Sequence, residues 1–193
     1  PVTVKQAQRL AVRLFGGKVV RSFTKPGAEW YEFSLKNTTR RQPYDLKPKT
    51  VFIASTALAG TFVKGVPGFA LPVRVENPSG PQWTSTYLGV TLFSGSPSKV
   101  GKVLGSTAMQ APNGDVSRIE AIDFQPDGVL ELALEVESSG PGGFLFRDLA
   151  VHSFGKGRTR ALFTTRTLED GPGLDVLINN AGMSAQALFE DVQ

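Results

Sequence analysis

The residue types that perform most enzyme chemistry are scarce in this chain. Its 193 residues include no cysteine and a single histidine, His152. Without thiolates there is no disulfide, cysteine nucleophile or thiolate metal site, and one imidazole cannot supply a zinc-binding histidine cluster. Carboxylate pairs occur at Glu135/Glu137 and Asp123/Asp127, but glycoside hydrolysis needs two carboxyls opposed across a cleft. Carboxylates that are neighbours on one strand or loop are more simply explained as solvated surface groups. We therefore predict that the protein is not an enzyme.

One string near the end of the chain looks like an enzyme signature. Residues 173–182 read GLDVLINNAG, which looks like the fourth-strand signature of short-chain dehydrogenases. Such enzymes also carry a glycine-rich turn about seventy residues earlier that lets the backbone approach a pyrophosphate. Here that region has Pro97 inside the turn and Lys99 at the place of the middle glycine. The catalytic tyrosine of such enzymes is also lacking, because no tyrosine follows Tyr87. We therefore interpret the match as accidental and predict no cofactor.

Three aspartates lie in short loop strings that suit either a turn or a hard cation. Asp115 follows Asn-Gly, while Asp123 and Asp127 flank the run Phe-Gln-Pro and are followed by Gly128. Clustered oxygens bind calcium, and the same residues supply the backbone angles that turns need. The sequence leaves both interpretations open, and we assign no metal site.

Lysine and arginine are concentrated at the start of the sequence. Residues 1–50 hold eleven Lys or Arg against three acids, whereas residues 51–193 hold ten against fourteen. Lysine and arginine side chains that neutralise phosphates release the counterions condensed on the nucleic acid. This binding depends on the backbone charge, so a basic segment binds nucleic acid with little sequence specificity. A basic surface that is only solvated is the alternative. The predicted RNA-binding residues are Lys5, Arg9, Arg13, Lys18, Arg21 and Lys25, and a secondary basic cluster comprises Lys156, Arg158 and Arg160.

Hydrophobic periodicity places these cations on a helix, strands and a loop. Residues 3–15 have apolar side chains at helical spacing and Lys5, Arg9 and Arg13 four apart on another face, and two glycines follow. Glycine and proline then divide the chain into short apolar runs of strand length. Residues 99–104 and 184–192 suit short helices. The predicted strands are Lys18–Phe23, Trp30–Leu35, Thr50–Ala57, Phe69–Val75, Thr84–Phe93, Ile119–Phe124, Val129–Glu137, Leu145–Phe154 and Ala161–Thr167.

Several strands and no alternation with helices indicate an all-β protein. We predict an antiparallel jelly-roll sandwich with a short N-terminal amphipathic helix and a C-terminal extension, with an immunoglobulin-like sandwich as the alternative. The expected domains are a basic N-terminal arm over 1–25, the sandwich over 26–168 and an acidic tail over 169–193. No segment approaches the roughly 20 apolar residues that cross a bilayer, so we predict no membrane contact.

Three segments resemble the coat proteins of small plant positive-strand RNA viruses of the bromovirus and ilarvirus group. They are the arm QAQRLAVR at 6–13, the string LGVTLFSGSPSKV at 88–100, and the pair of runs 129–137 and 144–154 joined by SSGPGG. In that group a similar apolar strand turns into a short Lys-Val helix. The resemblance implies a jelly-roll capsid subunit that assembles with copies of itself around genomic RNA, in virions and in the host cytoplasm during assembly.

The sequence thus supports two functions of different classes. The first is a self-assembling viral coat protein that packages RNA through its basic N-terminal segment. The alternative is a monomeric β-sandwich module that binds carbohydrate or protein through exposed aromatic side chains. Large aromatics on strands more often belong to the core, and the candidates are Trp30, Tyr31, Trp83 and Tyr87.

Overall fold

Two antiparallel sheets and one helix make up the part of the chain that the computed structural model describes. This part comprises residues 1–25, 27–39, 43–44, 46–78, 84–112, 116–139, 145–155, 158–170 and 180–182. The prediction of an all-β protein with a short N-terminal helix is confirmed. Within these ranges no helix has the length and apolar character that a bilayer crossing requires.

Helix α1 spans Val4–Phe15 and is closed at both ends by local hydrogen bonds. Thr3 and Gln6 form a capping box, in which the Gln6 N–H donates to Thr3 Oγ1 at 3.3 Å and the Thr3 N–H donates to Gln6 Oε1 at 2.7 Å. The helix ends at Gly16, whose φ of +70° favours glycine. Its apolar face is buried and comprises Ala7, Leu10, Ala11 and Phe15.

The first sheet contains seven strands. Its order is β1-β2-β3-β5-β6-β7, and β4 pairs with β5 outside this path. Strand β1 forms one edge and β7 the other. The bounds are β1 Lys18–Phe23, β2 Trp30–Lys36, β3 Thr50–Ala54, β4 Leu58–Val63, β5 Val66–Pro78, β6 Thr84–Ser96 and β7 Lys99–Pro112.

The second sheet contains five strands in the order β12-β11-β10-β9-β8. Each strand is antiparallel to its neighbours. The bounds are β8 Val116–Ile122, β9 Glu131–Ser139, β10 Leu145–Gly155, β11 Arg158–Asp170 and β12 Asn180–Gly182.

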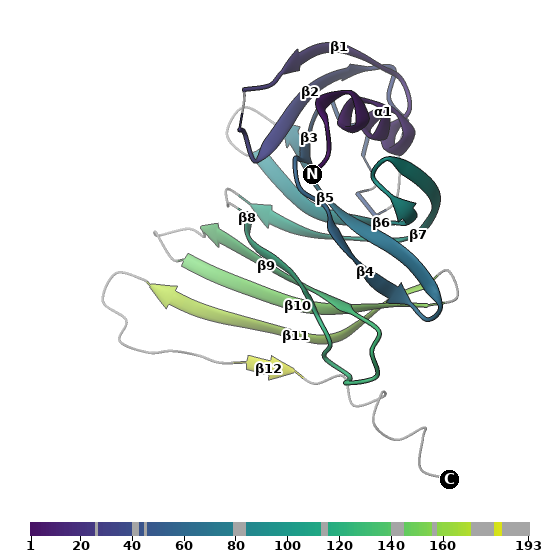
Figure 1. Ribbon diagram of the computed structural model, residues 1–193. Coiled ribbons are helices and arrows are strands. Elements are labelled where there is room, and N and C mark those ends of the chain that lie inside the picture. Colours follow the sequence, from purple (N-terminus) through teal and green to yellow (C-terminus); the bar gives the residue numbers. More distant parts are fainter. Residues whose placement is uncertain are drawn as a thin grey trace.

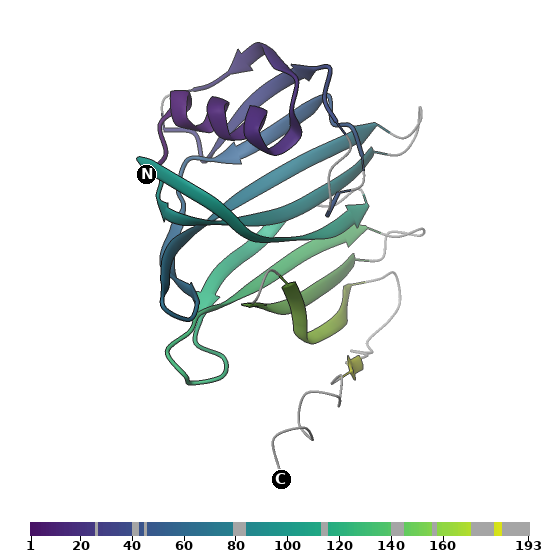
Figure 2. The same cartoon turned by 90° about the vertical axis from the view of Figure 1, so that its right-hand side faces the viewer.

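The first sheet is covered on both faces. Because side chains alternate along a strand, Phe69 and Leu71 of β5 pack with Leu10 of α1, while Val90 of β6 packs with Leu132 of β9 in the second sheet. Figures 1 and 2 show the resulting layers, with α1 against one side of the first sheet and β8–β12 on the other. The two clusters together form the core of the molecule.

Most sequential strands are neighbours in the two sheets; the exception is β3, which pairs with β5, as β4 also does. A jelly roll instead interleaves strands from two Greek keys between its sheets. The described strands form two meanders, and the jelly-roll order that we predicted is not confirmed. Short connections explain this order, because closing a short loop costs the least chain entropy.

Each predicted strand has a counterpart in the structure, and three of the described strands, β4, β7 and β12, were not predicted. The helix expected at residues 99–104 is wrong because these residues begin β7. Ser96 pairs with Lys99 across a tight hairpin, and Gly101 and Gly105 disfavour a helix in this run. The helix predicted at residues 184–192 lies outside the described residues.

The predicted N-terminal arm and C-terminal tail are both partly built into the sheets. Val2 is buried, α1 packs on the core, and β1 pairs with β2 across the predicted boundary at residue 25. At the other boundary β11 continues to Asp170, and β12 adds three residues of the predicted tail to the second sheet. The N-terminal cations are therefore carried by folded elements.

Candidate nucleic-acid interface

The row of cations on α1 faces solvent, as its spacing predicts. Lys5 and Arg9 are exposed, four residues apart and on the side of the helix away from Ala7 and Leu10. Within the described part of the chain, neither side chain forms an ion pair or a hydrogen bond. Both cations are therefore available to an anionic partner.

Arg13 joins the helix to a distant hairpin. Its guanidinium donates a 2.5 Å hydrogen bond to the Gly101 carbonyl and lies 5.3 Å from the centroid of the Phe93 ring. Gly101 lies between Lys99 and Lys102, which are exposed on the β6–β7 hairpin. The α1 row is thus extended by two cations that the sequence analysis missed, because nothing local links residues separated by 88 positions.

The cations of β1 form a second group. Val20 is a bulge, so Lys18, Arg21 and Phe23 share one face of the edge strand, with Arg21 5.2 Å from the Phe23 ring centroid. The opposite face carries Val19, which packs toward α1. The six predicted cations therefore form two groups on different faces, one on α1 and one on and just after β1, where Lys25 is exposed.

Several carboxylates of the body pair with arginines of the body. Arg118 pairs with Glu120 at 2.6 Å, and Arg147 lies 2.7 Å from Glu137 and 3.5 Å from Glu135. The salt bridges of the described residues all lie between β5 and β11, and none includes an N-terminal cation. The positive charge at the N-terminal side is therefore not cancelled within this part of the molecule.

Arg158 and Arg160 of the secondary basic cluster line a cavity of about 1060 Å³ at one end of the sandwich. We call it the end cavity. Lys156 lies outside the described residues. The cavity walls come from the β4–β5 turn, the loop before β9 and the facing ends of β10 and β11. Its lining residues are Val63, Lys64, Gln125, Asp127, Val129, Glu131, Ser153, Phe154, Gly155, Arg158, Thr159 and Arg160.

Glu131 forms part of one wall of the end cavity and binds the backbone of the loop before β9. Its side chain is 2% exposed and accepts a hydrogen bond from the Phe124 N–H at 2.8 Å. Burial raises the pKa of Glu131, and the charges of Asp127 and Asp123 act in the same direction. Asp123 and Asp127 accept backbone hydrogen bonds at 3.2 and 2.9 Å, which favours the turn interpretation of this loop.

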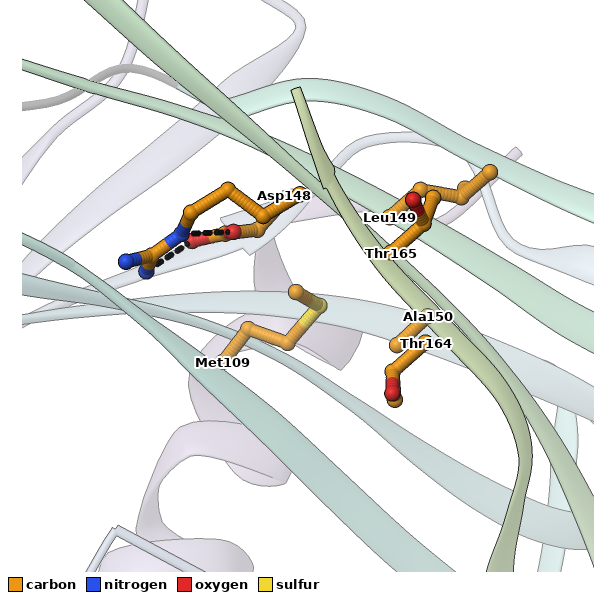
Figure 3. Close-up of a pocket in the computed structure, with 7 residues that line it drawn as sticks. Met109, Asp148, Leu149, Ala150, Thr164 and Thr165 are labelled. Atoms are coloured by element: carbon orange, nitrogen blue, oxygen red, sulfur yellow. Dashed lines mark hydrogen bonds and ion pairs between the residues drawn. The ribbon is translucent and has the colours of Figure 1, made fainter. Parts of the chain in front are cut away.

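A smaller pocket of about 340 Å³ lies beside β10 and β11 (Figure 3). Its one ion pair is bidentate, with Arg166 Nε and Nη2 donating to the Asp148 carboxylate at 2.6 and 2.8 Å. This hydrogen bonding raises the pKa of Arg166. Met109 and Ala150 add apolar surface. Because Asp148 is held by Arg166, the pocket has no free carboxylate for acid–base chemistry.

The single histidine, His152, is half-buried and lies beside a threonine side chain. Thr107 Oγ1 lies 3.4 Å from both ring nitrogens of His152, and burial lowers the pKa of the imidazole. Among the residues that the structure describes, no three His, Asp or Glu side chains gather as metal ligands. Of the aromatic candidates, Trp30, Tyr31 and Tyr87 are half-buried, and Trp83 lies outside the described residues.

Comparison with protein-family models, with curated proteins and with solved structures finds no match to this chain.

Proposed function

We propose that this chain is a self-assembling viral coat protein that packages RNA through the cations of α1 and β1. The observation that carries the proposal is that Lys5 and Arg9 are exposed and unpaired within the described residues. The resemblance to plant-virus coat proteins in the sequence supports the same class. Binding is electrostatic and tolerant of sequence, because phosphate contacts carry no base information.

The distribution of charge favours one RNA-binding side. Helix α1, strand β1 and the β6–β7 hairpin, which carry these cations, lie on the side of the molecule away from β9–β11 (Figure 1). The acids Glu120, Glu135, Glu137 and Asp148 lie in the second sheet. Because Arg118, Arg147 and Arg166 pair with these acids, Arg158 and Arg160 are the cations that the described part of the second sheet leaves for phosphate.

Strand β1 supplies a surface for contacts between copies. Among the described strands it is an outermost strand of the first sheet, and an open edge presents unpaired N–H and C=O groups that can pair with another strand. Val20 and Phe23 are each 47% exposed on this strand. Their burial in an assembly would add apolar stabilisation to backbone pairing.

A pair of matched double variants tests the proposal. Lys5→Ala/Arg9→Ala removes two cations from α1 without touching Arg13, which holds the helix to the hairpin. Arg158→Ala/Arg160→Ala removes the same charge from the second sheet. Purified protein with bound RNA has a high ratio of absorbance at 260 to 280 nm, and we expect that ratio to fall in the α1 variant only. Equal RNA content in the two variants would contradict the proposal.

A pocket next to Trp30 favours the second function, a monomeric binding module. Trp30, Glu29 and Arg118 line about 300 Å³ between the two sheets, and an aromatic face with polar neighbours suits a sugar. Light scattering separates the two functions. A 20.7 kDa monomer at low salt favours the module if the fluorescence of a Trp83→Phe variant, which retains Trp30, changes with oligosaccharide. Particles of megadalton mass favour the shell.

A further inference from the structure

The end cavity combines apolar walls with positive charge. Val63, Val129 and Phe154 line it together with the three cations Lys64, Arg158 and Arg160. Of its two acids, Glu131 is buried and holds the Phe124 N–H, and Asp127 accepts a hydrogen bond from Val129. The cavity is therefore suited to a segment that carries both apolar and acidic side chains.

The path of β12 leads toward this cavity. Strand β12 runs antiparallel to β11, with Asn180 opposite Arg166 and Gly182 opposite Thr164. The chain therefore leaves Gly182 in the direction of Arg158, the first residue of β11. At about 3.3 Å per residue, the six-residue step from Thr164 to Arg158 covers roughly 20 Å. Eleven residues follow Gly182 in the sequence, which span up to about 36 Å when extended.

The residues that follow Gly182 have a composition that matches the lining of the end cavity. They read MSAQALFEDVQ, with Leu188 and Phe189 directly before Glu190 and Asp191. The sequence contains no lysine or arginine after Arg166. Glu190 and Asp191 come eight and nine residues after Gly182 in the sequence, which is more than the six-residue step from Thr164 to Arg158 along β11.

We propose that residues 183–193 dock in the end cavity of their own chain. Leu188 and Phe189 pack against the apolar walls, and Glu190 and Asp191 pair with Lys64, Arg158 and Arg160. Opposite charges that are partly withdrawn from water attract more strongly than exposed ones. The docked segment covers Arg158 and Arg160 and leaves the cations of α1 and β1 exposed.

Disulfide trapping in the full-length protein tests this docking. The chain has no cysteine, so Lys64→Cys/Glu190→Cys contains only the two introduced thiols, at exposed or tail positions that do not disturb the core. Under mild oxidation we expect a disulfide within one chain, seen as a faster-migrating monomer on a non-reducing gel and confirmed by peptide mass mapping. The matched control is Lys47→Cys/Glu190→Cys, because Lys47 is exposed beside the α1 core.

Charge substitutions in the cavity identify what holds the segment. Adding Arg158→Glu/Arg160→Glu to the trapping variant should slow disulfide formation about tenfold, because paired charges become repulsive. Adding Arg158→Lys/Arg160→Lys should preserve the rate to within about twofold, since both charges remain.

Two outcomes would overturn the proposal. Equal trapping rates at residues 64 and 47 would show that the segment has no preferred site, and disulfide-linked dimers would assign the cavity to the tail of a second copy. The experiment is done without RNA, so its result is independent of the RNA-binding proposal.

Discussion

Individual side chains in this protein divide into those that have partners and those that are free. Arg147 and Arg166 lie beside carboxylates of the second sheet, and Arg13 binds a carbonyl and an aromatic ring. Lys5 and Arg9 have no such contacts within the described residues. Formal charge therefore overstates the number of cations that a polyanion can use, and the α1 row supplies two that are free.

Among the residues that the structure describes, the buried hydroxyl of Tyr44 has no hydrogen-bond partner, and burial raises the pKa of this phenol. Tyr44→Phe removes the unsatisfied group and keeps the ring that packs on Phe15. Since a buried polar group without a partner costs about 1–3 kcal/mol, we expect the free energy of unfolding to rise by roughly 1 kcal/mol in urea titration. A lower stability would show that the hydroxyl is satisfied in solution.

Glu131 gives the fold a pH dependence. Its pKa is raised from 4.5 by burial, so the folded protein holds this proton more tightly than the unfolded chain does. The stabilisation is complete below the ordinary pKa and is lost as the pH rises through the raised value. The Glu131→Gln variant has no titratable group at this position, so its stability lacks this contribution to the pH dependence.

The measurement for Glu131 is thermal unfolding of the wild type and Glu131→Gln at about pH 4 and about pH 7. We expect the melting temperature of the wild type, relative to the variant, to be lower at the higher pH. The opposite trend would mean that the hydrogen bond from Phe124 outweighs burial and stabilises the carboxylate.

At the scale of elements, α1 both covers the core on one face of the first sheet and presents exposed cations. Its two faces follow from one periodicity, since Ala7 and Leu10 face the first sheet and Lys5 and Arg9 face solvent. Strand β1 has the same dual character, because its bulge places cations on one face while Val19 packs inward. Anchoring these elements limits the geometry in which their cations meet RNA.

Leu10→Ala tests whether α1 contributes to the fold. Leu10 is 3% exposed in the cluster between α1 and the first sheet, and truncating a buried leucine costs about 2–5 kcal/mol. Gln8→Ala, at an exposed position of the same helix, should change stability by less than about 0.5 kcal/mol. Equal stability of both variants by chemical denaturation would indicate an arm that is detached in solution.

At the scale of the whole molecule, the fold gathers exposed cations on α1, β1 and the β6–β7 hairpin. In the second sheet Arg118, Arg147 and Arg166 pair with carboxylates, while the exposed Arg158 and Arg160 are separated from the first group and line the end cavity. Such a separation orients the subunit toward a polyanion. An assembly with that orientation would place the basic sides of all copies toward the packaged RNA.

The salt dependence of RNA binding measures this separation. Each phosphate contact contributes about −0.7 to the slope of log K against log salt for a single strand. Lys5→Ala/Arg9→Ala should therefore reduce the slope by about 1.4 in filter-binding titrations. Arg158→Ala/Arg160→Ala should leave the slope unchanged, and a loss of similar size would place RNA on the second sheet.

The sequence by itself determined the elements and the scarcity of catalytic residues. Alternation and helical spacing act between neighbours in the chain, so the strand over 18–23 and the helix over 3–15 followed from local pattern. The strand at 99–112 did not, because pairing with β6 decided its conformation. Only the tertiary structure brought Arg13 to the Gly101 hairpin and Lys64 to Arg158 and Arg160. These groups are distant in sequence, and sheet pairing, which local pattern does not encode, sets their distances in space.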